Sequence, residues 1–121
     1  MKKLDKMVLA QKFGSFNTVW EPHLAAELNG QQLKLVKCIG PGDALLHEED
    51  VLYLVFKGEL VVVFRDRQLR LEPGELIIVP KGTFCKLAAI RGAEVLILDP
   101  AGYRSPATLN GERFRERLRK V

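Results

Sequence analysis

A histidine, a run of carboxylates and a cysteine are the side chains of this sequence that could perform chemistry together. His47 is followed directly by Glu48, Glu49 and Asp50, and Cys85 lies further along the chain. Imidazole, carboxylate and thiolate groups are the usual protein ligands of divalent transition metals. An imidazole that titrates near neutral pH can also act as an acid or base or orient a ligand. The alternatives are a hydrogen-bonded histidine, a solvated acidic turn and a small buried cysteine.

Short apolar strands bounded by glycine and proline must position these side chains. Residues 72–85 contain two turns, Pro73-Gly74 and Pro80-Lys81-Gly82, around a β-branched core at residues 77–79. Residues 51–56 are apolar at every position, which predicts a central strand that is covered on both faces. Asn29-Gly30 predicts a type I′ hairpin, because that turn needs positive φ at both central residues. Further turns, at 40–43 and 91–93, give the spacing of an all-β sandwich or barrel.

The spacing of the stretch 72–85 resembles the second sequence motif of the cupin superfamily, G-x5-P-x-G-x2-H-x3-N. Gly74, Pro80 and Gly82 match the glycines and the proline of that motif. Cys85 stands where the family has a metal-binding histidine, and Ala89 where it often has asparagine. The resemblance implies the cupin fold and identifies Cys85 as a site position.

The family's first motif, G-x5-H-x-H-x3–4-E-x6-G, can be aligned upstream. Its last glycine matches Gly58, which places its glutamate at Val51 and, with the shorter spacer, its two histidines at Leu45 and His47. With the longer spacer the histidine positions move one residue back, to 44 and 46, and His47 is excluded. Tyr53 shares strand parity with Val51 and so is expected to point inward.

The resemblance therefore implies an all-β double-stranded β-helix, the cupin jelly-roll barrel, with a short C-terminal helix added. The expected ligand pocket consists of Leu45, His47, Val51, Tyr53 and Cys85. In the family, two histidines, a glutamate and a third histidine bind one divalent metal inside the barrel. Leu45 and Val51 offer only alkyl groups, so we expect no metal, no other cofactor and no catalytic residue. His23 has no role in either motif and is expected at the surface.

Charge and length divide the chain into two parts. The 121 residues suit a barrel domain at 1–102, followed by a basic arm at 103–121 with a helix over 112–120. The arm has six basic and two acidic side chains and so accounts for the whole net charge of +4. The barrel is balanced in charge, so a nucleic-acid partner is not indicated. Without an apolar run of about 20 residues, a signal sequence or a disulfide pattern, we expect a cytoplasmic protein that does not bind membranes.

Three functions remain open from the sequence. The first is a metal-independent module that binds a small molecule in the barrel or serves as an interaction domain. The second is a metal-dependent cupin enzyme, an isomerase or dioxygenase, in which His47 and Cys85 are helped by the neighbouring carboxylates. The third is a regulatory protein that acts through the basic arm. Because residues 51–56 are apolar on both faces, either the N-terminal segment or a second subunit must cover the outer face, and a homodimer is expected.

Overall fold

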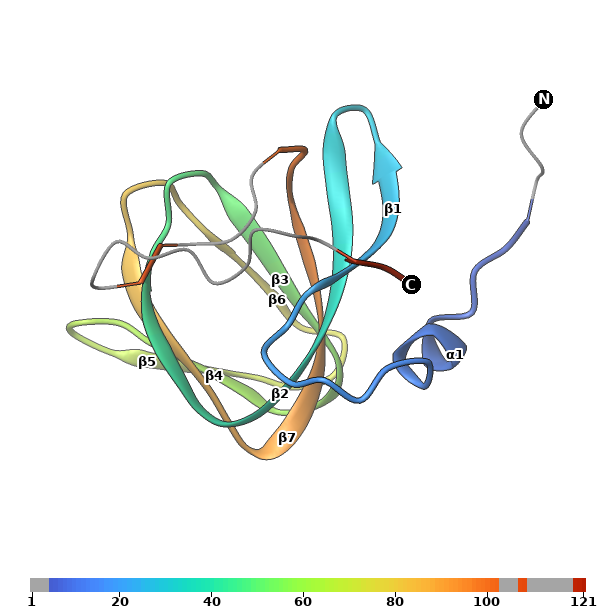
Figure 1. The fold of residues 1–121 in the computed structure, drawn as a ribbon. Coiled ribbons are helices and arrows are strands. Elements are labelled where there is room, and N and C mark those ends of the chain that lie inside the picture. The colour runs from blue at the N-terminus through green and yellow to red at the C-terminus, as the bar shows by residue number, and fades with distance from the viewer. Residues whose placement is uncertain (1–4, 103–106, 109–118) are drawn as a thin grey trace.

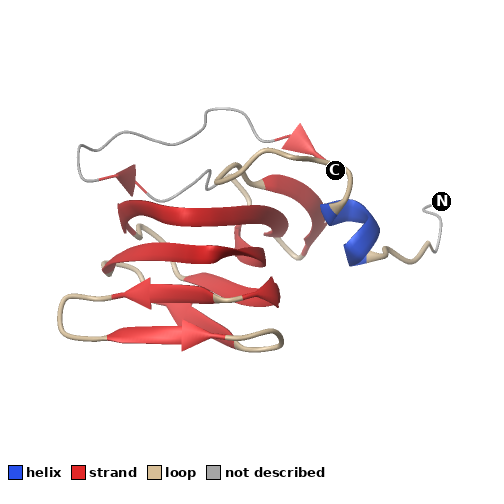
Figure 2. Cartoon of the chain, turned by 90° about the horizontal axis from the view of Figure 1, so that it is seen from below, coloured by secondary structure: helices blue, strands red, loops and turns tan. Residues whose placement is uncertain are grey.

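The computed structural model describes residues 5–102, 107–108 and 119–121. One mainly antiparallel sheet curls into a jelly-roll barrel, and a short helix lies beside it (Figures 1 and 2). The elements are α1 (Leu9–Phe13), β1 (His23–Leu28), β2 (Gln31–Leu46), β3 (Val51–Gly58), β4 (Leu60–Val63), β5 (Gln68–Leu71), β6 (Leu76–Val79), β7 (Phe84–Pro100), β8 (Ala107–Thr108) and β9 (Arg119–Lys120). This architecture confirms the expected fold class. Within these described segments, no helix has the length and apolar character needed to span a membrane.

Two long strands, β2 and β7, form the frame of the barrel. They pair antiparallel from Gln31–Pro100 at one end to Leu46–Phe84 at the other, with register shifts near their middle. The expected turns at 40–43 and 91–93 are bends inside these continuous strands. Gly40 and Gly92 have φ of 71° and 92°, so each chain can turn a corner while its pairing resumes beyond it. The Asn29-Gly30 turn has positive φ at both residues, as predicted.

Strand β3 lies between β6 and β7, which confirms the central position predicted from its apolar sequence. Val51, Tyr53 and Val55 point into the barrel core, while Leu54 and Phe56 belong to a second apolar cluster on the outer face. Gly58 ends the strand with φ of 83°, and a Cβ there would lie 2.2 Å from the Gly92 carbonyl oxygen. The close approach of these two backbones therefore requires glycine.

The N-terminal segment covers part of the outer face. Helix α1 lies in this segment and buries Phe13. The Phe13 ring stacks on Phe56 with centroids 5.3 Å apart. His23 is buried, its ring lies 4.0 Å from that of Phe16, and its Nε2 is 2.8 Å from the Thr18 hydroxyl. The surface position expected for His23 is therefore wrong, because residues 13–18 fold back over the start of β1.

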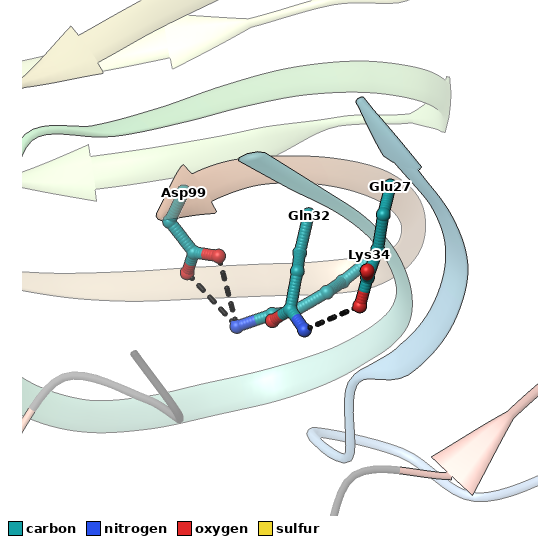
Figure 3. A network of polar contacts seen from close by, with 4 residues as sticks. All are labelled: Glu27, Gln32, Lys34 and Asp99. Carbon is teal, nitrogen blue, oxygen red and sulfur yellow. Dashed lines mark hydrogen bonds and ion pairs between the residues drawn. The ribbon is translucent and has the colours of Figure 1, made fainter. Parts of the chain in front are cut away.

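A buried ion pair joins the two long strands, from Lys34 on β2 to Asp99 on β7. Lys34 Nζ lies 2.9 Å and 3.0 Å from the two Asp99 carboxylate oxygens, and the side chains are 1% and 2% exposed (Figure 3). Burial raises the pKa of Asp99, and the Lys34 ammonium opposes that rise. Losing either partner would leave an uncompensated buried charge, which typically costs about 3–5 kcal/mol. A second, exposed bond links Gln32 to Glu27 beside it.

The described part of the C-terminal arm returns to the barrel. Strand β8 pairs with β2, and β9 pairs in parallel with β1. Val121 donates its N–H to the Leu24 carbonyl at 2.8 Å and packs on the outer apolar cluster. Most of the helix expected over 112–120 falls outside the described residues. Arg119 and Lys120, its expected end, form a strand instead, because β1 offers them an open edge for pairing.

Candidate functional site

The five residues expected to form a pocket all lie inside the barrel. Leu45, Val51, Tyr53 and Cys85 belong to one core cluster, and each is less than a tenth exposed. His47, at the end of β2, is completely buried and contacts two of them. Leu45 lies directly opposite Cys85 in the β2–β7 register. The alternation of strand residues thus brings these side chains together from β2, β3 and β7.

Both ring nitrogens of His47 have hydrogen-bonding neighbours. Nε2 lies 2.8 Å from the Tyr53 hydroxyl, and Nδ1 lies 3.3 Å from the Thr83 carbonyl oxygen. A carbonyl oxygen can only accept, so we assign the ring proton to Nδ1 and let Tyr53 donate to Nε2. The backbone holds the histidine as well, since its N–H donates to Thr83 and its carbonyl accepts from Gly82.

Burial keeps the titratable groups of this core uncharged. It lowers the pKa of His47, against the opposing effect of backbone hydrogen bonds to Thr83 and Leu45. It raises the pKa of Cys85 to about 11 and that of Cys38 to about 12. Both cysteines are free and buried, and the Cys85 sulfur lies 4.0 Å from His47 Nδ1. A neutral imidazole beside a protonated thiol makes a poor nucleophilic pair, because the reactive species is the thiolate.

A small apolar cavity lies next to this group. Its volume is about 60 Å³, and it is lined by Trp20, Pro22, Val36, Cys38, Leu45, Tyr53, Leu60, Leu87, Val95 and Ile97. Leu45 and Tyr53 are therefore wall residues, whereas His47, Val51 and Cys85 lie in the core beyond them. The cavity is much smaller than the roughly 150 Å³ cavity that admits benzene in an engineered protein. It suits one small apolar group.

The residues at the family's metal positions do not fit a divalent ion. Leu45 and Val51 have no ligand atoms, and the His47 nitrogen that lacks a proton accepts from Tyr53. Across the described parts of the chain, no three His, Cys, Asp or Glu side chains come close enough to hold a metal. Asp50 uses a carboxylate oxygen to accept from the Lys81 backbone N–H at 2.8 Å, so it supports the turn.

The motif comparison missed most of the cavity wall, though simple strand alternation could have found part of it. Val36 and Cys38 alternate with Leu35 on β2, and Val95 and Ile97 alternate with Leu96 on β7. Trp20 carried no such signal. It lies before β1 with φ of 58°, and its indole N–H donates to the Ile39 carbonyl at 2.9 Å. A long-range contact of this kind cannot be read from local sequence.

We expect His47 to make stability depend on pH. Its folded pKa is below the ordinary value of 6.5, so the unfolded chain binds this proton more tightly. The contribution of neutral His47 to the free energy of unfolding is complete above about pH 6.5. It is lost as the pH falls through the folded pKa. Urea unfolding at about pH 7.5 and about pH 5 should show a fall in the wild type and a smaller fall in His47→Gln. Equal falls in the two proteins would contradict this assignment.

Comparison with solved structures supports the fold. No family model matches the sequence, and no curated protein does. A cupin-2 domain protein from Shewanella frigidimarina is 35% identical, over 78% of this chain and 93% of that one, with a TM-score of 0.76. A protein from Neisseria meningitidis is 22% identical over 80% and 100% of the two chains, with a TM-score of 0.72. Hydroquinone 1,2-dioxygenase from Sphingomonas, solved with 4-hydroxybenzoate bound, shares the fold at 12% identity, 86% and 83% coverage and a TM-score of 0.65. This chain is 35% identical to the Shewanella protein over most of its length and forms the same barrel. It therefore belongs to the cupin superfamily, as a small cupin-2 domain protein.

Proposed function

We propose that this cupin domain binds a small apolar group in its barrel without the help of a metal. The observation that carries the proposal is the hydrogen bonding of His47, whose two ring nitrogens both face a partner inside the chain. At the neighbouring motif positions, Leu45 and Val51 add apolar packing worth about 1.5–3 kcal/mol per fully buried side chain. The residues at the family's metal position are therefore part of the core, and the ligand would bind in the cavity beside them.

The walls of the cavity define what it would accept. Leu60, Leu87, Val95 and Ile97 favour an apolar group by excluding it from water. Tyr53 also lines the cavity, and its hydroxyl donates to His47. Trp20 is only partly buried at the wall. A ligand with one small apolar end fits this arrangement.

Short alkanols should bind to the barrel and be detected through the only tryptophan. Trp20 lines the cavity, so its fluorescence should change saturably with the concentration of ethanol, propanol or butanol. Val95→Leu adds a methylene at the cavity wall and should weaken this response severalfold. Val61→Leu makes the same change on a residue of β4 that lies outside the core cluster and should leave it unaltered. An unsaturable response, or equal responses from both variants, would contradict binding in the barrel.

Restoring the family's ligands should create a metal site that the wild type lacks. In the triple variant Leu45→His, Val51→Glu and Cys85→His, His47 would serve as the fourth ligand. We expect calorimetric titration with Ni²⁺ or Mn²⁺ to show one-to-one binding by the variant and none by the wild type. The variant should also be less stable without metal, because it buries polar groups in an apolar core. Tight binding by the wild type that His47→Ala abolishes would favour a metal-dependent cupin enzyme. One of the solved structures that share this fold is a dioxygenase.

We also propose that a second copy of the chain covers the exposed part of the outer sheet face. The register places Ile78, Leu52, Leu98 and Leu33 in one cross-strand row and Leu76, Leu54, Leu96 and Leu35 in the next. The N-terminal segment packs on the middle of these rows, but Leu76 and Ile78 remain 52% and 57% exposed. They lie on β6, which pairs with β3 alone among the described strands. Large apolar residues that stay exposed on a sheet face are typical of a protein–protein contact.

The charges around β6 favour an identical partner. Glu72 and Glu75 precede the strand and Lys81 follows it, and all three are exposed. If two copies pack their outer faces together about a two-fold axis with the β6 strands antiparallel, the acidic end of each strand meets the basic end of the other. This self-complementarity is what an isologous dimer interface requires.

The dimer can be tested by analytical ultracentrifugation at micromolar concentration. The wild type should sediment as a dimer, and Ile78→Lys should shift it toward the monomer because it places two like charges at the interface. Ile90→Lys is the matched control, since Ile90 is 84% exposed and lies on β7 away from β6. A wild-type mass of 13.6 kDa would overturn the proposal.

A further inference from the structure

We infer that a second hollow, at the end of the barrel where β2, β3 and β7 bend, binds a small organic anion with an apolar body. The hollow has a volume of about 430 Å³, within the range of roughly 300–1,000 Å³ typical of small-molecule sites. It lies outside the barrel cavity and shares with it only the buried Cys38 among their described lining residues. The inference goes beyond the binding proposed for the barrel and does not depend on it.

Three cations and one carboxylate surround this hollow. Lys37, Lys57 and Arg91 line it together with Glu94, which leaves two net positive charges. In the sheet register Glu94 lies directly between Lys37 on β2 and Lys57 on β3. None of these four side chains forms an ion pair with any residue that the structure describes. The net positive charge around the hollow raises the local concentration of anions.

Lys37 is held in place before any ligand arrives. Its ammonium group donates to the Phe16 carbonyl at 2.7 Å and lies 5.2 Å from the centre of the Phe16 ring. Its backbone is also fixed, because its carbonyl accepts from the Trp20 N–H at 2.7 Å. An ammonium group has three donors, so Lys37 keeps donors for a ligand. A cation fixed in this way loses little side-chain entropy on binding.

Apart from Asn17, the remaining side chains of the wall are apolar. Val19 and Ile39 line the hollow and are 46% and 58% exposed, so an apolar surface lies beside the cations. Gly58 and Gly92 lie in close backbone contact, since a Cβ added to Gly58 would collide with the Gly92 carbonyl oxygen. Ile39 is fixed through its carbonyl, which accepts from the Trp20 indole. The hollow therefore combines a positive rim with an apolar wall, which suits an alkyl or aryl carboxylate better than a bare inorganic anion.

The probes for this site are hexanoate, acetate and hexylammonium, followed by amide chemical shifts in the full chain. Hexanoate should shift the amides of Val19, Ile39 and Gly92 saturably. Acetate should bind more weakly because it lacks the apolar body, and hexylammonium should not bind because its charge has the wrong sign. Binding should weaken as salt is added, since Lys57 and Arg91 are exposed to solvent. Equal binding of hexanoate and hexylammonium, or no saturable shift at these amides, would overturn the inference.

Single substitutions separate a built site from a merely basic surface. Lys57→Ala and Arg91→Ala should each weaken hexanoate binding severalfold, and Glu94→Gln should tighten it because it removes the opposing charge. Lys86→Ala removes an exposed lysine of β7 that does not line the hollow, and it should change nothing. These side chains lie at the surface, so the variants are expected to fold. A loss of affinity as large in Lys86→Ala as in Arg91→Ala would show that net charge alone attracts the anion and would overturn the inference.

Discussion

The pairing of β2 with β7 is the constraint on which the rest of the molecule depends. The two strands stay paired on both sides of a shared corner, so each contributes to both halves of the barrel. Strand β1 attaches to β2, and β3 and β4 attach to β7. Strands β5 and β6 then pair with β4 and β3. The corner itself produces the hollow at the barrel's end, because it brings Gly92 of β7 against both Gly58, at the end of β3, and Ile39 of β2. Both candidate binding regions thus follow from one ladder and its bend.

The polar groups inside the barrel have polar partners there. Lys34 and Asp99 neutralise each other at one place, and His47, Tyr53 and the Thr83 carbonyl satisfy one another at a second. Burial is costly for a polar group unless it is hydrogen-bonded, so these partnerships are a condition for keeping such residues in the core. They also fix the rotamers of the side chains beside the cavity. The interior is therefore specified by a few polar contacts and filled by aliphatic packing.

The outer face shows how one sheet can be apolar on both sides. Its inner residues close the barrel, while the outer leucines of β2, β3 and β7 accept Phe13, Phe16 and Val121 from the two ends of the chain. The cover is partial, and its limit falls at β6, where the apolar residues become exposed. Charged residues take over at the barrel's end, beginning with Lys37, Glu94 and Lys57. The same face thus passes from a covered core through an exposed apolar strip to a polar rim.

The sequence by itself determined the fold class, because turn residues and strand alternation act locally. The positive φ at Asn29 and Gly30, the central position of residues 51–56 and the inward direction of Tyr53 all followed from such rules. The motif spacing also brought Leu45 and Cys85 face to face across two strands. Only the tertiary structure decided that 40–43 and 91–93 are bends, since a glycine permits either outcome and the partner strand selects one. It also buried His23, joined Lys34 to Asp99 across 65 residues and set the size of the cavity. These features depend on contacts between distant segments, for which no local pattern carries a signal.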